Sequence, residues 1–223
     1  MSDTDSFIDE VTEEVRRDRL YGYVRRYGWI AALVIVLIVG AAGYTEYRRA
    51  QEEARAQALG DAMIAAMAAN EDAGRADALA GVTADTPEGA AILAFLTSGA
   101  QAQAGRTEAA VQTLQPVVDA ADLPLIYRQV AGFKSLLLQS ETQDAATRRA
   151  GFEAFATPGL RLRLLAEEQL ALIDIETGDT GAAIARFQAI LDDAEATPGL
   201  QRRALQAMVA LGGAPEATET AGE

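Results

Sequence analysis

The chain has 223 residues and a formal net charge of −14, and it contains neither histidine nor cysteine. The lack of both residue types removes the commonest general base, the thiol nucleophiles and the usual zinc and haem ligands. The acidic surplus argues against a nucleic-acid-binding protein, which needs a cationic face. Alanine is abundant and no alternating strand pattern occurs, so we expect an all-α protein.

Residues 1–26 are polar, first acidic and then basic, and we expect them to form a cytoplasmic N-terminal segment. Apolar residues recur at helical spacing within it: Phe7, Ile8, Val11 and Val15. Two interpretations of this stripe are open, namely a docking helix or a juxtamembrane helix that only sets topology. The second is favoured, because a stripe of four apolar residues is a weak signal.

Residues 27–45 read YGWIAALVIVLIVGAAGYT and carry no charge over 19 residues. A transmembrane helix needs about 20 mostly apolar residues to cross a hydrocarbon core of about 30 Å. Aromatic rings near both ends and arginines before the stretch predict the membrane anchor residues, which are Tyr27, Trp29, Tyr44, Arg25 and Arg26. A buried core helix or a cleaved secretion signal is the alternative, but the polar leader of 26 residues is long for a signal. We therefore expect one uncleaved transmembrane helix.

The arginine distribution predicts the orientation of this span. Within about 15–20 residues of each end, which is the region that sets topology, five arginines precede the span and three follow it. This excess places the N-terminus in the cytoplasm. The rest of the chain then lies on the outer side, which is the periplasm if the membrane is the inner membrane of a Gram-negative bacterium.

Residues 46–211 are predicted to form a tetratricopeptide-like α-solenoid of helical hairpins. We expect the helix of the span to continue to Asn70, followed by a short helix over 75–80. No proline interrupts this stretch, and a small-residue stripe supports the continuing helix: Tyr47, Ala54, Ala58, Ala62 and Ala65.

Four residue pairs predict helix starts: Thr86–Pro87, Leu123–Pro124, Thr157–Pro158 and Thr197–Pro198. Threonine caps the free N–H groups of a first turn, and proline at the first helical position loses no hydrogen bond. The strings TPGLRLR at 157–163 and TPGLQRR at 197–203 are near-copies 40 residues apart. Self-similarity at a period of about 20–50 residues indicates stacked helical repeats.

The predicted helix starts indicate three helical hairpins. The clearest pairs residues 159–177 with 180–194 around a turn at Gly178–Asp179, and an earlier one begins with residues 88–103 and turns at Gly105. The second helices of these two hairpins are predicted to bury matching residues: Ala183, Phe187 and Ile190 in one, and Ala110, Leu114 and Val117 in the other. These small, aromatic and apolar positions resemble the tetratricopeptide pattern, although its early aromatic residue is missing.

Between these hairpins, residues 124–139 and 144–155 are predicted to form a degenerate hairpin whose turn lacks glycine. A final helix over 198–211 is expected to cover the last hairpin with Leu200, Leu205, Met208 and Leu211, because a stack otherwise ends in exposed apolar surface. Residues 212–223 are acidic and small and are predicted to be a disordered tail.

Stacked hairpins curve, and their first helices line a concave surface suited to an extended segment or a partner helix. The repeat register predicts the residues of this candidate binding face: Ile92, Phe95, Arg128, Leu165, Glu168 and Leu172. Phe95 is the expected anchor, because aromatic residues dominate binding hot spots. Ordinary core packing is the alternative interpretation for Phe95, Leu165 and Leu172.

No catalytic, cofactor-binding or metal-binding residues are predicted. Pairs of adjacent carboxylates occur, among them Glu52–Glu53, Glu167–Glu168 and Asp192–Asp193. Adjacent residues on a helix point about 100° apart, so these pairs do not converge and are expected to form solvated acidic faces. The only lysine, Lys134, stands among many arginines, which indicates a GC-rich genome rather than a Schiff-base lysine. We therefore do not expect the protein to be an enzyme.

The string EVTEEVRRDR at residues 10–19, followed by a basic and aromatic run, one span and tetratricopeptide-like hairpins, resembles the YfgM-like proteins of bacteria. The likeness covers nearly the full chain, including the two TPGL strings. It implies an ancillary subunit of the SecYEG translocon, with a periplasmic repeat domain of the kind shared with the cell-division coordinator CpoB. It also implies association with a membrane-anchored, prolyl-isomerase-like chaperone and with newly exported proteins, and it brings no catalytic residue.

We therefore expect a single-pass protein of the bacterial inner membrane whose periplasmic repeat domain binds protein partners. The expected partners are the Sec translocon, a periplasmic chaperone or exported clients, with no nucleic acid, small-molecule substrate or cofactor. The alternative is a cell-division or envelope-assembly adaptor.

Overall fold

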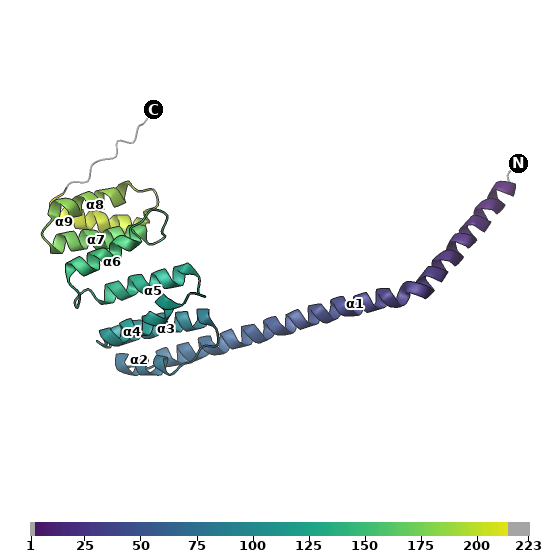
Figure 1. Cartoon of the computed structure of the whole chain (residues 1–223), viewed down its shortest axis with the longest axis horizontal. Helices are drawn as coiled ribbons and strands as arrows, with labels where there is room; N and C mark the ends of the chain where they lie inside the picture. The colour runs from purple at the N-terminus through teal and green to yellow at the C-terminus, as the bar shows by residue number, and fades with distance from the viewer. Residues whose placement is uncertain (1–2, 214–223) are drawn as a thin grey trace, which may run out of the picture. The chain divides into compact units, whose positions relative to one another are not determined.

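The computed structural model describes the backbone of residues 3–213 and the side chains of residues 25–30 and 32–213. Within this range the chain forms helices and loops and no strand, as predicted for an all-α protein (Figure 1). The helices are α1 Asp3–Met67, α2 Asp72–Ala80, α3 Pro87–Gln103, α4 Thr107–Asp119, α5 Leu125–Leu138, α6 Ala145–Phe155, α7 Arg163–Glu176, α8 Thr180–Asp192 and α9 Pro198–Ala210. From residue 214 onward the predicted acidic tail lies outside the described residues, as do the side chains of the predicted apolar stripe before residue 16.

The chain divides into two compact units, of which the first ends at Ala58 and the second begins at Leu59. The first unit consists of α1 up to that boundary. Among the described residues, α1 is the one helix that is long and apolar enough to cross a membrane, by length and composition. The apolar side chains of its 18-residue core window are not buried in the structure, and Trp29 and Tyr44 are exposed at either end.

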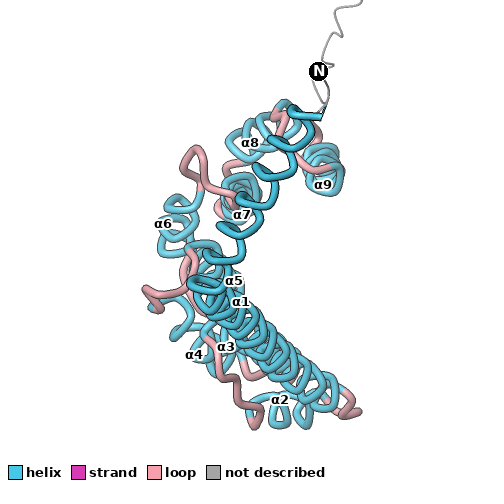
Figure 2. Tube along the Cα trace, turned by 90° about the vertical axis from the view of Figure 1, so that its right-hand side faces the viewer, coloured by secondary structure: helices cyan, strands magenta, loops and turns pink. Residues whose placement is uncertain are grey.

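In the second unit each helix packs on the next along the chain, from α2 to α9. Figure 2 shows these helices in a curved row, with α4 and α6 on its left-hand, outer edge. Buried side chains form successive clusters between neighbouring helices, so the core follows the row instead of forming one centre.

The contact of α5 with α6 differs from the other contacts in this row. Packing between these two helices is slighter than that of α5 on α4 or of α6 on α7. It rests on Phe133 of α5, whose ring meets Phe152 and Phe155 of α6 edge-on at centroid distances of 5.3 and 5.7 Å. The degenerate hairpin predicted here is thus present as two helices, which also meet where Leu136 of α5 lies over Gly151 of α6.

The sequence left the buried face at the end of α1 unidentified. The five members of the small-residue stripe are all exposed, whereas Met63 and Ala66 are buried. Ala66 packs in a cluster with Ala76 and Leu79 of α2. Alanine occurs on every side of this helix, so its spacing does not mark the buried face. The helix ends at Met67 instead of Asn70, and α2 begins three residues before the predicted helix.

The two TPGL strings adopt different structures, which corrects the predicted helix over 159–177. At Thr197 the side-chain Oγ1 accepts a hydrogen bond from the N–H of Leu200, and α9 begins at Pro198 as predicted. At Thr157 the hydroxyl donates instead to the carbonyl of Ala154 in α6. Because α6 ends at Phe155, residues 156–162 must turn the chain, and Gly159 takes a φ of +86° there. Helix α7 consequently starts only at Arg163.

The other predicted helix starts and hairpins hold more closely. Helix α3 begins at Pro87 behind a capping Thr86, and α5 begins directly after Pro124. At the predicted turn Gly178 has a φ of +85°, and Asp179 caps α8 by accepting from the N–H of Ala182 at 3.0 Å. The matching core residues of the two clear hairpins are buried as predicted: Ala110, Leu114, Val117, Ala183, Phe187 and Ile190.

The covering helix α9 buries only part of its predicted set. Leu200 and Met208 are buried against α7 and α8, and Leu211 packs partly on the same cluster. Leu205 is 39% exposed, so its prediction as a covering residue is wrong. The buried position on that turn belongs to Ala204, because close approach of α9 to the cluster favours the smaller side chain.

Candidate functional site

Exposed apolar side chains are unevenly distributed over the second unit. From α2 to α9, the large hydrophobic side chains that are exposed all belong to α3, α5, α7 and α9: Ile92, Leu125, Ile126, Leu137, Leu172, Leu205 and Val209. None of this class is exposed on the described α2, α4, α6 or α8. Single exposed apolar residues are ordinary, but their restriction to alternate helices makes these four helices the candidate interaction face.

The best-defined part of this face lies where α3 meets α5. Ile92 is 46% exposed, and Phe95 is partly buried one turn later on α3. The Phe95 ring stacks on Tyr127 of α5, with centroids 6.5 Å apart and an interplanar angle of 8°. Phe95 also packs on the cluster that contains Leu114. The ring is therefore held by the core on one side, as the core-packing interpretation expects, and stays partly accessible on the other, as a binding anchor requires.

Arg128 lies on α5, one turn after the exposed Leu125. The guanidinium is partly buried, and its Nε is fully buried with no hydrogen-bond partner among the described residues. Neither an ion pair nor a side-chain hydrogen bond compensates its charge within the described chain.

The three residues of α7 that were predicted for the binding face differ in their exposure and contacts. Leu172 is 45% exposed, whereas Leu165 is partly buried on the Phe133 cluster, as the core-packing interpretation expects. Glu168 is buried, and its carboxylate accepts hydrogen bonds from Arg203 of α9 at 2.6 and 2.8 Å. This pairing raises the pKa of Arg203. The Glu168 carboxylate thus links α7 to α9 and is not free to bind a partner.

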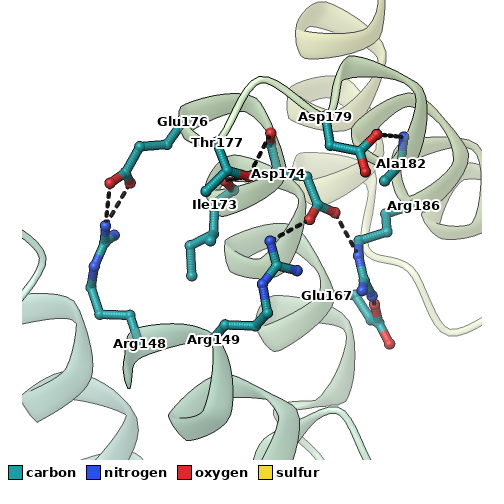
Figure 3. Close-up of polar contacts among 10 residues, drawn as sticks. All are labelled: Arg148, Arg149, Glu167, Ile173, Asp174, Glu176, Thr177, Asp179, Ala182 and Arg186. Carbon is teal, nitrogen blue, oxygen red and sulfur yellow. Dashed lines mark hydrogen bonds and ion pairs between the residues drawn. The ribbon is translucent and has the colours of Figure 1, made fainter. Parts of the chain in front are cut away.

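A buried ion network joins α6, α7 and α8, and sequence reasoning missed it (Figure 3). Its centre is Asp174, which is 2% exposed and lies 2.6 Å from Nη2 of Arg149 and 2.9 Å from Nε of Arg186. Arg186 also donates to Glu167 at 2.6 Å. Arg148 donates to both oxygens of Glu176 at 2.6 Å at the edge of this network.

The charges in this network compensate one another. Burial opposes the charged form of Arg186, but the hydrogen bonds that it donates to Asp174 and Glu167 outweigh this effect and raise its pKa. Glu167 and Asp174 are seven residues apart on α7 and thus share a face, which is the signal that could have revealed the pair. Among the described residues, no group of three or more carboxylates is arranged to hold a metal ion. Because Arg149 of α6 and Arg186 of α8 both pair with Asp174 of α7, the network acts as a clamp between these helices.

A second, more exposed group of ion pairs sits where α8 leads into α9. Arg163 donates to Asp193 at 2.7 Å and to Glu195 at 3.0 Å. The hydrogen bond from Arg163, supported by the N–H of Glu195, lowers the pKa of Asp193. Since the folded pKa lies below the unfolded one, this carboxylate stabilises the fold above the unfolded value, and the contribution is lost as the pH falls through the lowered pKa.

Replacing Asp174 by asparagine is expected to destabilise the second unit by about 2–3 kcal/mol, because it leaves Arg149 without a carboxylate and Arg186 with Glu167 alone. The value is below that for a fully buried pair, since both arginines keep some contact with water. Urea unfolding of the full chain, followed by circular dichroism, measures the change. The matched control is Glu195→Gln, whose exposed side chain should contribute less than about 0.5 kcal/mol. Equal stability of the two variants would contradict the clamp.

Comparison with protein-family models, with curated proteins and with solved structures finds no match to this chain. The resemblance to the YfgM-like proteins therefore stays a prediction drawn from the sequence.

Proposed function

We propose that the chain is a membrane-anchored, tetratricopeptide-type scaffold that binds protein partners on the face formed by α3, α5, α7 and α9. The observation that carries this proposal is the restriction of exposed large apolar side chains to those four helices. The described intervening helices expose no large hydrophobic side chain, whereas the alternate helices expose Ile92 and Leu172, so the alternate helices are the ones suited to a partner.

The repeat character of the unit supports this proposal. Two second helices, α4 and α8, bury residues at the same spacing, with Ala110, Leu114 and Val117 matching Ala183, Phe187 and Ile190. Sequential packing from α2 to α9 is the arrangement that a solenoid requires. In such a solenoid the first helices of the hairpins line the inner surface, and these are the helices with exposed apolar residues.

The anchor is the apolar stretch 27–45 of α1. The described side chains of its apolar core window are not buried in the structure, and a lipid bilayer is the environment that removes such a surface from water. The arginine excess before the span orients the N-terminus to the cytoplasm and the repeat unit to the periplasm of a bacterial inner membrane.

The resemblance to the YfgM-like proteins narrows the partners to the export machinery. The chain then serves as an ancillary subunit of the Sec translocon and assists exported proteins together with periplasmic chaperones. A partner-binding scaffold needs surface rather than reactive groups, and the lack of histidine and cysteine in the chain is compatible with that role.

Site-specific photo-crosslinking in living cells tests this function. A photoreactive residue in place of Ile92 or Leu172 should capture translocon subunits, chaperones or exported proteins, identified by mass spectrometry. The matched controls replace Gln112 of α4 and Ala189 of α8, which are exposed on the intervening helices and should capture much less. Equal capture from the controls would contradict the proposed face. Capture of cell-division proteins without the translocon would favour the adaptor alternative over the export role.

A further inference from the structure

The only lysine of the chain, Lys134, lies on α5 with its charged end over α3. A Cβ built on Gly99 would lie 3.8 Å from Nζ of Lys134. Since the missing side chain at Gly99 leaves room there, the ammonium rests against the surface of α3. Lys134 forms no hydrogen bond or ion pair with any described residue.

The ammonium lies next to the apolar part of the candidate face. Ile92, Phe95 and Gly99 are spaced at i, i+3 and i+7 and thus share one face of α3. Tyr127, which stacks on Phe95, lies seven residues before Lys134 and on the same side of α5. A single positive charge therefore stands at one end of a surface made of an exposed aliphatic side chain and two stacked rings.

Lys134 is one of a minority of cations without an ion pair in this unit, where acidic residues outnumber basic ones. The arginines on or beside α4, α6 and α8 are all paired: Arg106 with Asp77, Arg148 with Glu176, Arg149 with Asp174, and Arg186 with Asp174 and Glu167. The cations without an ion pair in the described part of the second unit are Arg128, Lys134, Arg161 and Arg202. Two of these four belong to α5 and one to α9, which are helices that also carry exposed apolar residues.

We propose that Ile92, Phe95, Gly99, Tyr127 and Lys134, called here the α3–α5 site, bind a segment of a partner protein in which an apolar side chain neighbours a carboxylate. The carboxylate pairs with Lys134, and the apolar side chain lies on Ile92 and the two rings. This inference rests on the proposed function, since it names the kind of segment that the scaffold accepts. One ammonium matches the single charge of a carboxylate, whereas a phosphate group carries a charge of about −1.5 to −2 and is usually bound by several donors.

The test uses the full chain in nanodiscs of neutral phosphatidylcholine and a short fluorescent peptide that carries leucines around one glutamate. Fluorescence anisotropy should show binding that empty nanodiscs lack and that weakens with added salt. A peptide with glutamine in place of the glutamate should bind about tenfold more weakly, as expected for loss of one charge-assisted hydrogen bond. Lys134→Gln should lower the affinity for the glutamate peptide by the same factor and leave that for the glutamine peptide unchanged.

The matched control is Arg202→Gln, which removes another unpaired cation of the same face and should leave binding of the glutamate peptide unchanged. Equal affinity of Lys134→Gln and the parent chain for this peptide would overturn the site, and so would an equal loss in both variants. Carbodiimide coupling offers an independent readout, because the chain has one lysine to which a bound carboxylate can be joined. If peptide binding fails while crosslinking from Ile92 and Leu172 succeeds, the α3–α5 site is wrong and the proposed function is unaffected. Failure of that crosslinking with intact peptide binding would instead remove the proposed function.

Discussion

Replacing Phe187 by alanine is expected to lower the free energy of unfolding of the second unit by about 3–5 kcal/mol, the usual cost of removing a buried aromatic side chain. Phe187 is 1% exposed and belongs to a cluster with Ala171 of α7 and Met208 of α9. Three helices therefore meet on this one ring. Because several neighbours are alanines, which have no side-chain length to fill a void, the cavity should persist.

Urea unfolding of the full chain in micelles, followed by the helical circular dichroism signal, measures this loss. The control is Phe187→Leu, which retains most of the buried volume and should cost less than about 1.5 kcal/mol. A similar small loss for the alanine variant would contradict the packing of α9 on α7 and α8.

Placing two arginines in the middle of the apolar stretch, with Val36→Arg and Leu37→Arg together, is expected to abolish stable membrane integration. Each arginine at the centre of a span costs about 2.5–3.5 kcal/mol on insertion scales, so the pair opposes insertion by about 5–7 kcal/mol. The stretch has no charged residue of its own to compensate the added charge. Alkaline carbonate extraction of membranes should move the variant protein to the soluble fraction, while the parent chain stays in the pellet.

The control for this prediction exchanges the same two residues, Val36→Leu and Leu37→Val, and so keeps the length and apolar character of the stretch. It should remain in the pellet. Extraction of the parent chain by carbonate, or retention of the double arginine variant, would contradict a transmembrane role for residues 27–45.

Local backbone chemistry explains which parts of the fold were predictable from the sequence. The turn at Gly178–Asp179 needs a left-handed residue followed by a helix cap, and few residue pairs other than glycine and aspartate meet both needs. The burial of Phe187 follows from its spacing with Ala183 and Ile190 on an amphipathic helix. Such features depend on a few neighbouring residues, so the sequence predicts them correctly.

Features that depend on distant residues were not predictable. Thr157 and Thr197 head nearly identical strings, but α6 ends directly before the first string, so that string must turn the chain. The packed face at the end of α1 is chosen by α2, which selects Met63 and Ala66 among many equivalent alanines.

The candidate site shows the same division. Ile92 and Leu172 are exposed at the positions that the repeat register predicts. The repeat spacing alone determines which side of a first helix points away from the core. The pairing of Glu168 with Arg203, by contrast, joins residues 35 positions apart. The position of the Lys134 ammonium over Gly99 likewise could not be predicted from the sequence. Such contacts require the arrangement of the helices and cannot be read from spacing along one of them.

Labelling of single engineered cysteines tests most directly whether the apolar helix holds the repeat unit on the outer side of a membrane, because the chain has no cysteine of its own. Gln112→Cys on α4 and Ser6→Cys in the N-terminal segment are compared in spheroplasts treated with a membrane-impermeant maleimide. The account predicts that the cysteine at position 112 is labelled at once and that the one at position 6 reacts only after detergent is added. Labelling of position 6 alone before detergent, or of neither position, would contradict it.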